Sequence, residues 1–127
     1  MKKQDLPLSP HLQIYKPQIT SLLSISHRIS GVALNFVLVI LVLGLLCITL
    51  GESYFELLIS LITFFPIKII IFLAILGFSY HFLNGIRHII WDFGFLLGNR
   101  SSAIFGYFII ATSIISSIFI SRLLGLF

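Results

Sequence analysis

Three long apolar stretches constrain what this chain can fold into. No charged residue occurs in Ile29–Gly51 or in Ser101–Ser121, and Lys68 is the only charge in Leu57–Ile86. A helix needs about 20 apolar residues to cross a lipid bilayer, and each stretch is long enough. Membrane β-strands are shorter and alternate apolar with polar positions, which these stretches do not. We therefore predict an all-α membrane protein with three transmembrane helices, at about 22–50, 66–93 and 103–126.

The composition excludes the main classes of soluble protein. Hydrophobic residues make up 58% of the 127-residue chain and charged residues 9%, whereas ordinary globular proteins are about 25% charged. Such an apolar chain is not disordered, and its single cysteine, Cys47, excludes a disulfide scaffold. The net charge of +4 comes from scattered basic residues, so we expect a lipid membrane and no nucleic acid as a partner.

The distribution of Lys and Arg predicts the orientation of the spans. Basic residues lie before the first span and around the turn after the second, whereas the connection after the first span has two Glu and no Lys or Arg. The positive-inside rule then places the N-terminus in the cytoplasm and the C-terminus outside. We expect residues 1–21 to form a cytoplasmic, Pro-containing segment and residues 22–127 a three-helix anchor, with Pro66 in the first turn of the second helix.

The N-terminus also bears on localisation. It has neither the apolar core of a signal peptide nor the Arg-rich, acid-free composition of an organelle transit peptide. We therefore expect a multi-pass protein of the bacterial inner membrane rather than of the mitochondrial inner membrane.

His81 is the strongest candidate for chemistry, because ionisable residues within membrane spans are costly and mark function. Neutral imidazole is a common metal ligand, and Gly77 and Gly85 lie one turn to either side on the same face, where they leave a flat groove suited to a porphyrin. The same pattern fits a small-residue packing face with a hydrogen-bonded histidine. His88 lies on the same helix and His27 near the membrane surface, so a bis-histidine haem would need a ligand from a second chain.

The start of the first span offers a second candidate site. Ser24 and Arg28 are one turn apart on one helix face, with His27 beside them. A permanently charged guanidinium fits a haem propionate or a quinone carbonyl oxygen, with the Ser24 hydroxyl as a second hydrogen-bonding group. The alternative is an Arg that extends to the lipid head groups.

A polar stripe is predicted at the end of the second span. His88 and Asp92 each fall within about 20° of His81 at 100° per residue. Asp92 is placed to pair with His88 or with Arg28; the alternative is a capped helix end at a wet interface. The third span has several serines and no ionisable residue before Arg122, so we expect it to pack rather than to react.

Three segments in this order, Ser9–Pro17, Ser24–Gly31 and His81–Asp92, closely resemble the cytochrome b subunit of succinate dehydrogenase, the larger membrane anchor of respiratory complex II. The resemblance covers the whole chain. It implies one half of a heterodimeric, haem-binding helix bundle, whose other half is a second hydrophobic anchor subunit.

The resemblance also implies roles for individual residues. His81 matches the axial ligand of a single b-type haem, with the second ligand supplied by the partner anchor. Ser24 and Arg28 match residues of the ubiquinone site, and His27 and Arg28 lie where the family contacts the haem propionates.

The implied function is that of a subunit of an enzyme complex, succinate:quinone oxidoreductase, without the succinate-oxidising site. Electrons from succinate would pass through a flavoprotein subunit and an iron–sulfur subunit to ubiquinone. Two other interpretations are the anchor of a fumarate reductase that uses menaquinol, and a non-redox small membrane protein. The copurifying quinone would identify the first, and a Soret band would exclude the second.

Overall fold

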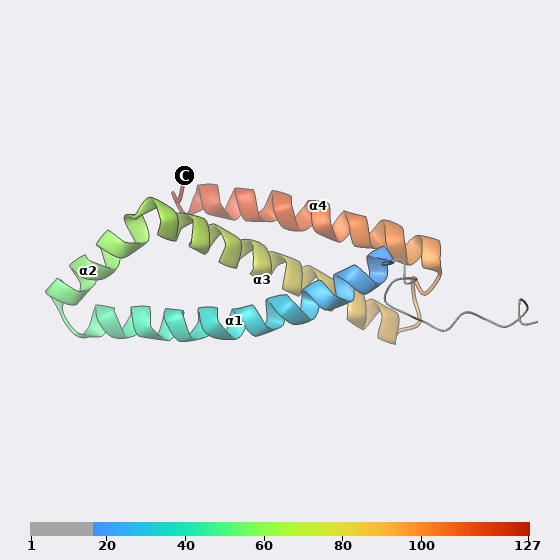
Figure 1. Cartoon of the computed structure of the whole chain (residues 1–127), viewed down its shortest axis with the longest axis horizontal. Coiled ribbons are helices and arrows are strands. Elements are labelled where there is room, and N and C mark those ends of the chain that lie inside the picture. The colour runs from blue at the N-terminus through green and yellow to red at the C-terminus, as the bar shows by residue number, and fades with distance from the viewer. Residues whose placement is uncertain (1–16) are drawn as a thin grey trace, which may run out of the picture.

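The computed structural model describes residues 17–127, which form four helices (Figure 1). Their bounds are α1 Ile19–Thr49, α2 Glu52–Thr63, α3 Phe65–Asp92 and α4 Asn99–Leu123. The helices α1, α3 and α4 are long and apolar enough to cross a membrane, so the described residues have the predicted all-α fold with three candidate spans.

The ends of the spans differ by a few residues from the expected ranges. The first helix already begins at Ile19, so residues 19–21 belong to α1 rather than to the N-terminal segment. Pro66 lies in the first turn of α3, as predicted, because a helix start needs no N–H from that residue. Residues 9–16, which carry most of the first family-like segment, lie outside the described residues.

The short helix α2 was not predicted. Residues 52–63 were expected to form part of a connection, because a search for apolar stretches of membrane length does not detect a helix of this size. Gly51 joins α1 to α2 with φ 115° and ψ 178°, a conformation that essentially only glycine adopts. The chain can therefore reverse within two residues after α1 ends.

The helices are arranged around α3. In Figure 1, α1 crosses α3 near the start of α1 and diverges from it toward the other end, which α2 closes. The helix α4 runs along α3, and the C-terminus returns to the start of α3. There the ring of Phe127 meets those of Phe65 and Phe72, at centroid distances of 6.5 and 6.2 Å.

Burial in this chain is the inverse of that in a soluble protein. Many large apolar side chains on the spans are exposed, whereas most of the fully buried side chains are small or polar. Membrane helices associate in this way, because small residues allow close approach and lipid already solvates apolar surface. On α4 the buried stripe includes Ser113, Ser117 and Ser121, which agrees with the expectation that this helix packs.

Candidate functional site

Two hydrogen bonds set the register of α1 against α3. The Tyr80 hydroxyl donates to the Leu23 carbonyl at 2.7 Å, and one residue later His81 Nδ1 lies 3.1 Å from the His27 carbonyl oxygen. Both acceptors are backbone atoms of α1, one turn apart. The His81 ring is thereby held against α1.

The partners of His81 determine which ring nitrogen carries its proton. A carbonyl oxygen only accepts, so the bond to His27 requires a proton on Nδ1. The Ser30 hydroxyl donates to the same carbonyl at 2.8 Å and therefore accepts from Nδ1, which lies 3.0 Å away. The lone pair then resides on Nε2, which has no partner within residues 17–127. Metal-bound histidines adopt this arrangement, with the non-ligating N–H fixed by a carbonyl.

Close approach between the two helices depends on Gly31. A Cβ atom at this position would lie 2.9 Å from His81 Cε1 and 3.6 Å from Nδ1, so only glycine leaves room for the ring. The sequence analysis expected Gly77 and Gly85 to leave a groove for a porphyrin or, alternatively, to form a packing face. A Cβ at Gly77 would meet nothing within 4 Å among the described residues, and one at Gly85 would make only an ordinary contact with His27, so the close packing within these residues does not use them.

Two other histidines gather around His27. Its ring stacks on that of His81, with centroids 4.0 Å apart and planes 6° from parallel, and lies 5.2 Å from the ring of His88. His27 is therefore level with His81, whereas the sequence analysis placed it nearer the membrane surface. The two rings present their faces, not their nitrogens, to each other. His27 Nδ1 is buried and has no partner in the described part of the chain.

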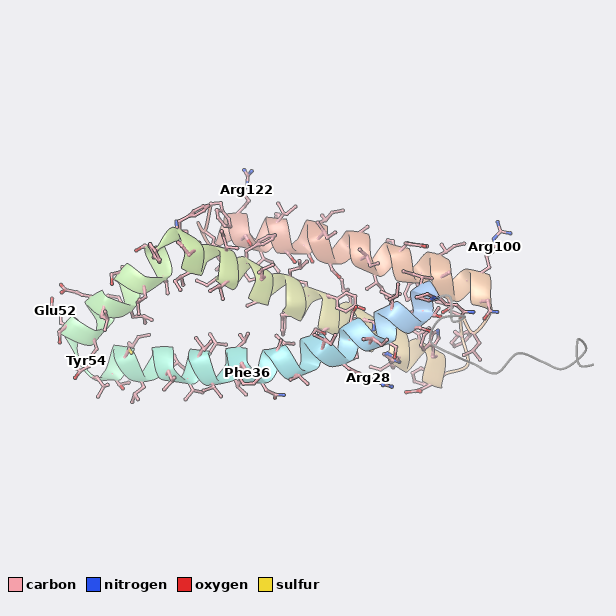
Figure 2. All side chains as sticks on the ribbon, viewed as in Figure 1. Arg28, Phe36, Glu52, Tyr54, Arg100 and Arg122 are labelled. Atoms are coloured by element: carbon pink, nitrogen blue, oxygen red, sulfur yellow. The ribbon has the colours of Figure 1, made fainter. Side chains whose placement is uncertain are left out.

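Arg28 is exposed on α1 beside this cluster. Figure 2 shows it on the side of α1 away from α4, near the crossing with α3. It borders a shallow groove with Val32 and Phe36 and makes no hydrogen bond or ion pair within residues 17–127. Ser24, one turn earlier, is half-buried. The structure thus leaves the guanidinium free for a ligand.

The predicted stripe on α3 is only partly present. His81 and His88 both contact His27, but Asp92 is exposed and pairs with neither His88 nor Arg28 in the described residues. Asp92 is the last residue of α3, so its carboxylate is available to water.

The sequence analysis did not assign a role to Arg87, which is completely buried between α3 and α4. Its guanidinium donates to the Ser102 hydroxyl at 2.9 Å and to the Ser102 carbonyl at 3.1 Å, and lies 4.1 Å above the ring of Trp91. The Trp91 ring meets His88 edge-on at 5.2 Å. Arg87 therefore connects α4 to the histidine cluster. The only indication of this role in the sequence was the position of Arg87 next to His88, inside a segment that resembles the family.

We expect Arg87→Lys to destabilise the bundle. Lysine keeps the charge but lacks the planar guanidinium, whose Nη2 donates to both oxygens of Ser102 while Nη1 donates to Asn84 Oδ1. Loss of one hydrogen bond of a charged group costs about 1.5–3 kcal/mol. Thermal denaturation of the assembled complex should show the loss, and Arg100→Lys, at an exposed residue without a partner in the described chain, is the control. Equal stability of the two variants would contradict the role given to Arg87.

Proteins with similar sequences show to which family the chain belongs. A sequence model described as the succinate dehydrogenase/fumarate reductase transmembrane subunit matches residues 2–120. The chain belongs to this family. The resemblance inferred from the three segments is therefore confirmed.

Members of the family with curated names include two bacterial proteins and one from an alga. A succinate dehydrogenase cytochrome b556 subunit of Rickettsia typhi is 44% identical over 109 residues, covering 86% of this chain and 85% of the relative. That of Rickettsia prowazekii is 43% identical with the same coverage. A cytochrome b560 subunit of Chondrus crispus is 40% identical over 119 residues, covering 87% of this chain and 90% of the relative.

Proposed function

We propose that this chain is the cytochrome b anchor of a succinate dehydrogenase and that His81 is one axial ligand of its haem b. The observation that carries the proposal is the contact between His81 Nδ1 and the His27 carbonyl: because a carbonyl only accepts, Nδ1 carries the proton and the Nε2 lone pair is left for iron. The names of the curated relatives, all cytochrome b subunits, support the same cofactor.

Residues next to His81 fit the rest of a haem site. His27 Nδ1 is unpartnered among the described residues, and Arg28 is unpaired there, so both suit the two propionate groups. A haem held there would supply one-electron redox chemistry. Within residues 17–127, the imidazoles of His27 and His88 pack against the His81 cluster, so a second iron ligand would come from the partner anchor subunit.

The quinone site is assigned to Ser24 and Arg28. A fixed cation beside a quinone carbonyl stabilises the negative charge that develops on that oxygen during reduction. Arg28 is exposed and borders an apolar groove, as a site for an apolar ring with polar oxygens requires. The Ser24 hydroxyl, one turn away, is a second donor.

The remaining roles follow from this assignment. The flavoprotein and iron–sulfur subunits oxidise succinate and pass electrons to ubiquinone at this chain. The chain anchors them in the bacterial inner membrane, with its N-terminus cytoplasmic. Arg28 and Arg100 lie at one end of the bundle and Glu52 at the other (Figure 2), which supports this orientation, although Arg122 lies toward the acidic end.

An optical spectrum of the purified complex, with and without dithionite, tests the proposal. We expect a Soret band and a reduced b-type spectrum, together with copurified ubiquinone. A complex without haem would refute the cytochrome assignment. Copurified menaquinol and preferential fumarate reduction would instead identify the fumarate reductase that the family description also covers.

A substitution at Gly31 tests the close packing of His81. The added methyl group of Gly31→Ala would lie 2.9 Å from His81 Cε1, so the ring must shift and its bond to the His27 carbonyl must lengthen. We expect a changed haem spectrum and a lower haem content. Gly44→Ala on the same helix is the control, because among the described residues its Cβ would contact only Leu58, at 3.9 Å. Identical spectra of both variants and the parent would show that Gly31 does not position the ligand.

A further inference from the structure

The short helix α2 connects the ends of two spans without crossing the membrane itself. Its 12 residues extend about 18 Å at 1.5 Å per residue, whereas a bilayer core is about 30 Å thick. Gly51 joins it to α1, and Phe64, in an extended conformation, joins it to α3. Because both neighbours are candidate spans, α2 lies at the end of the bundle where α1 ends and α3 begins.

The polar residues of α2 lie on one side. Glu52, Glu56, Ser60 and Thr63 fall within about 80° at 100° per residue. Leu58 lies on the opposite side and approaches Gly44 of α1, where a Cβ would be 3.9 Å from its Cδ1. The polar side of α2 therefore faces away from the bundle.

Hydrogen bonding distinguishes the acidic residues from the hydroxyl residues on this side. Ser60 donates to the Leu57 carbonyl and Thr63 to the Ile59 carbonyl, each at 2.7 Å, so both hydroxyls are satisfied within the helix. Glu52 and Glu56 have no partner among residues 17–127. Two unpaired carboxylates require water, because burial of an unpaired charge is costly.

The flanks of α2 require an apolar environment. Tyr54, Phe55, Leu57 and Leu61 are between 44% and 54% exposed. In Figure 2 the helix runs obliquely to the spans, from the end of the bundle that carries Glu52 and Tyr54 toward the end of α4 that carries Arg122, while Arg28 and Arg100 lie toward the other end. The acids of α2 thus suit water and its apolar flanks suit lipid.

We infer that α2 is an interfacial helix that binds the lipid head-group layer on the face opposite the histidine cluster, with its apolar flanks inserted. Its partner is the lipid surface, and insertion of apolar area drives the binding. Attraction to anionic lipids does not contribute, because α2 has two Glu and no Lys or Arg. The inference does not depend on the haem or quinone assignment.

Site-directed spin labelling of the assembled complex in lipid nanodiscs tests this inference. In a Cys47→Ser background, single cysteines replace neighbouring residues on the two sides of α2: Glu56→Cys and Ser60→Cys on the polar side, Leu57→Cys and Leu61→Cys on the flank. All four positions are exposed, so the variants should fold. Broadening by oxygen reports contact with lipid, and broadening by a water-soluble nickel chelate reports contact with water.

We expect the two sides to give opposite results. Labels at 57 and 61 should be broadened by oxygen and not by the chelate, and labels at 56 and 60 by the chelate. Three outcomes would overturn the inference. Chelate access at all four positions would place α2 in water, oxygen access alone at all four would place it within the bilayer core, and protection of 57 and 61 from both reagents would mean that another protein chain covers the flank.

Discussion

Replacement of His81 by leucine is expected to abolish haem binding while the protein still inserts into the membrane. The leucine side chain has no atom that can bind a metal, and the ring of the neighbouring His27 lies parallel to that of His81, so it presents its face rather than a nitrogen to this position. Insertion should not suffer, since leucine is more favourable than histidine in a span. The measurement is the reduced-minus-oxidised spectrum of membranes that contain the assembled complex.

Two further variants make this result specific. Ser30→Ala removes one of two acceptors for His81 Nδ1 and leaves the His27 carbonyl. Loss of a partner that orients a metal ligand typically costs about 10- to 100-fold in affinity, so haem should be bound more weakly but not lost. Phe82→Leu, at an exposed neighbour on α3, should retain haem. An unchanged b-type spectrum in His81→Leu would remove His81 as the ligand.

The substitution Arg28→Lys is expected to lower quinone reduction by about 100- to 1,000-fold, the effect of losing one donor to a developing oxyanion (about 2.7–4 kcal/mol). Lysine preserves the charge and reaches the head groups equally well, so an Arg that serves only as a flanking charge would tolerate the change. A quinone site that uses the guanidinium fork would not. Ser24→Ala should have a milder effect in the same assay.

Two controls separate lost catalysis from lost assembly. Succinate oxidation with a soluble acceptor, which takes electrons from the hydrophilic subunits, should stay at the parental rate in both variants. Arg100→Lys, at an exposed Arg toward the same end of the bundle (Figure 2), should leave quinone reduction unchanged. If assembled Arg28→Lys reduces quinone at the parental rate, Arg28 is a flanking charge and not part of the site.

Much of the architecture could be predicted because it follows from the thickness of the bilayer. A span requires about 20 uncharged residues, so the three apolar stretches specify the number of spans, and their charged borders place the ends to within a few residues. The short helix α2 was missed because its pattern is local and amphipathic and lies beside a longer apolar stretch.

The sequence by itself also identified candidate residues, since an ionisable group in an apolar stretch is conspicuous: His81, His27 and Arg28 were all recognised in this way. Only the tertiary structure decided how these residues meet. Three features depend on the register of one helix against another. They are the stacking of His27 on His81, the space that Gly31 leaves, and the burial of Arg87 against Ser102. That register is set by contacts of small residues and backbone carbonyls. These groups look the same in the sequence whichever helix they pack against, so the sequence does not reveal the register.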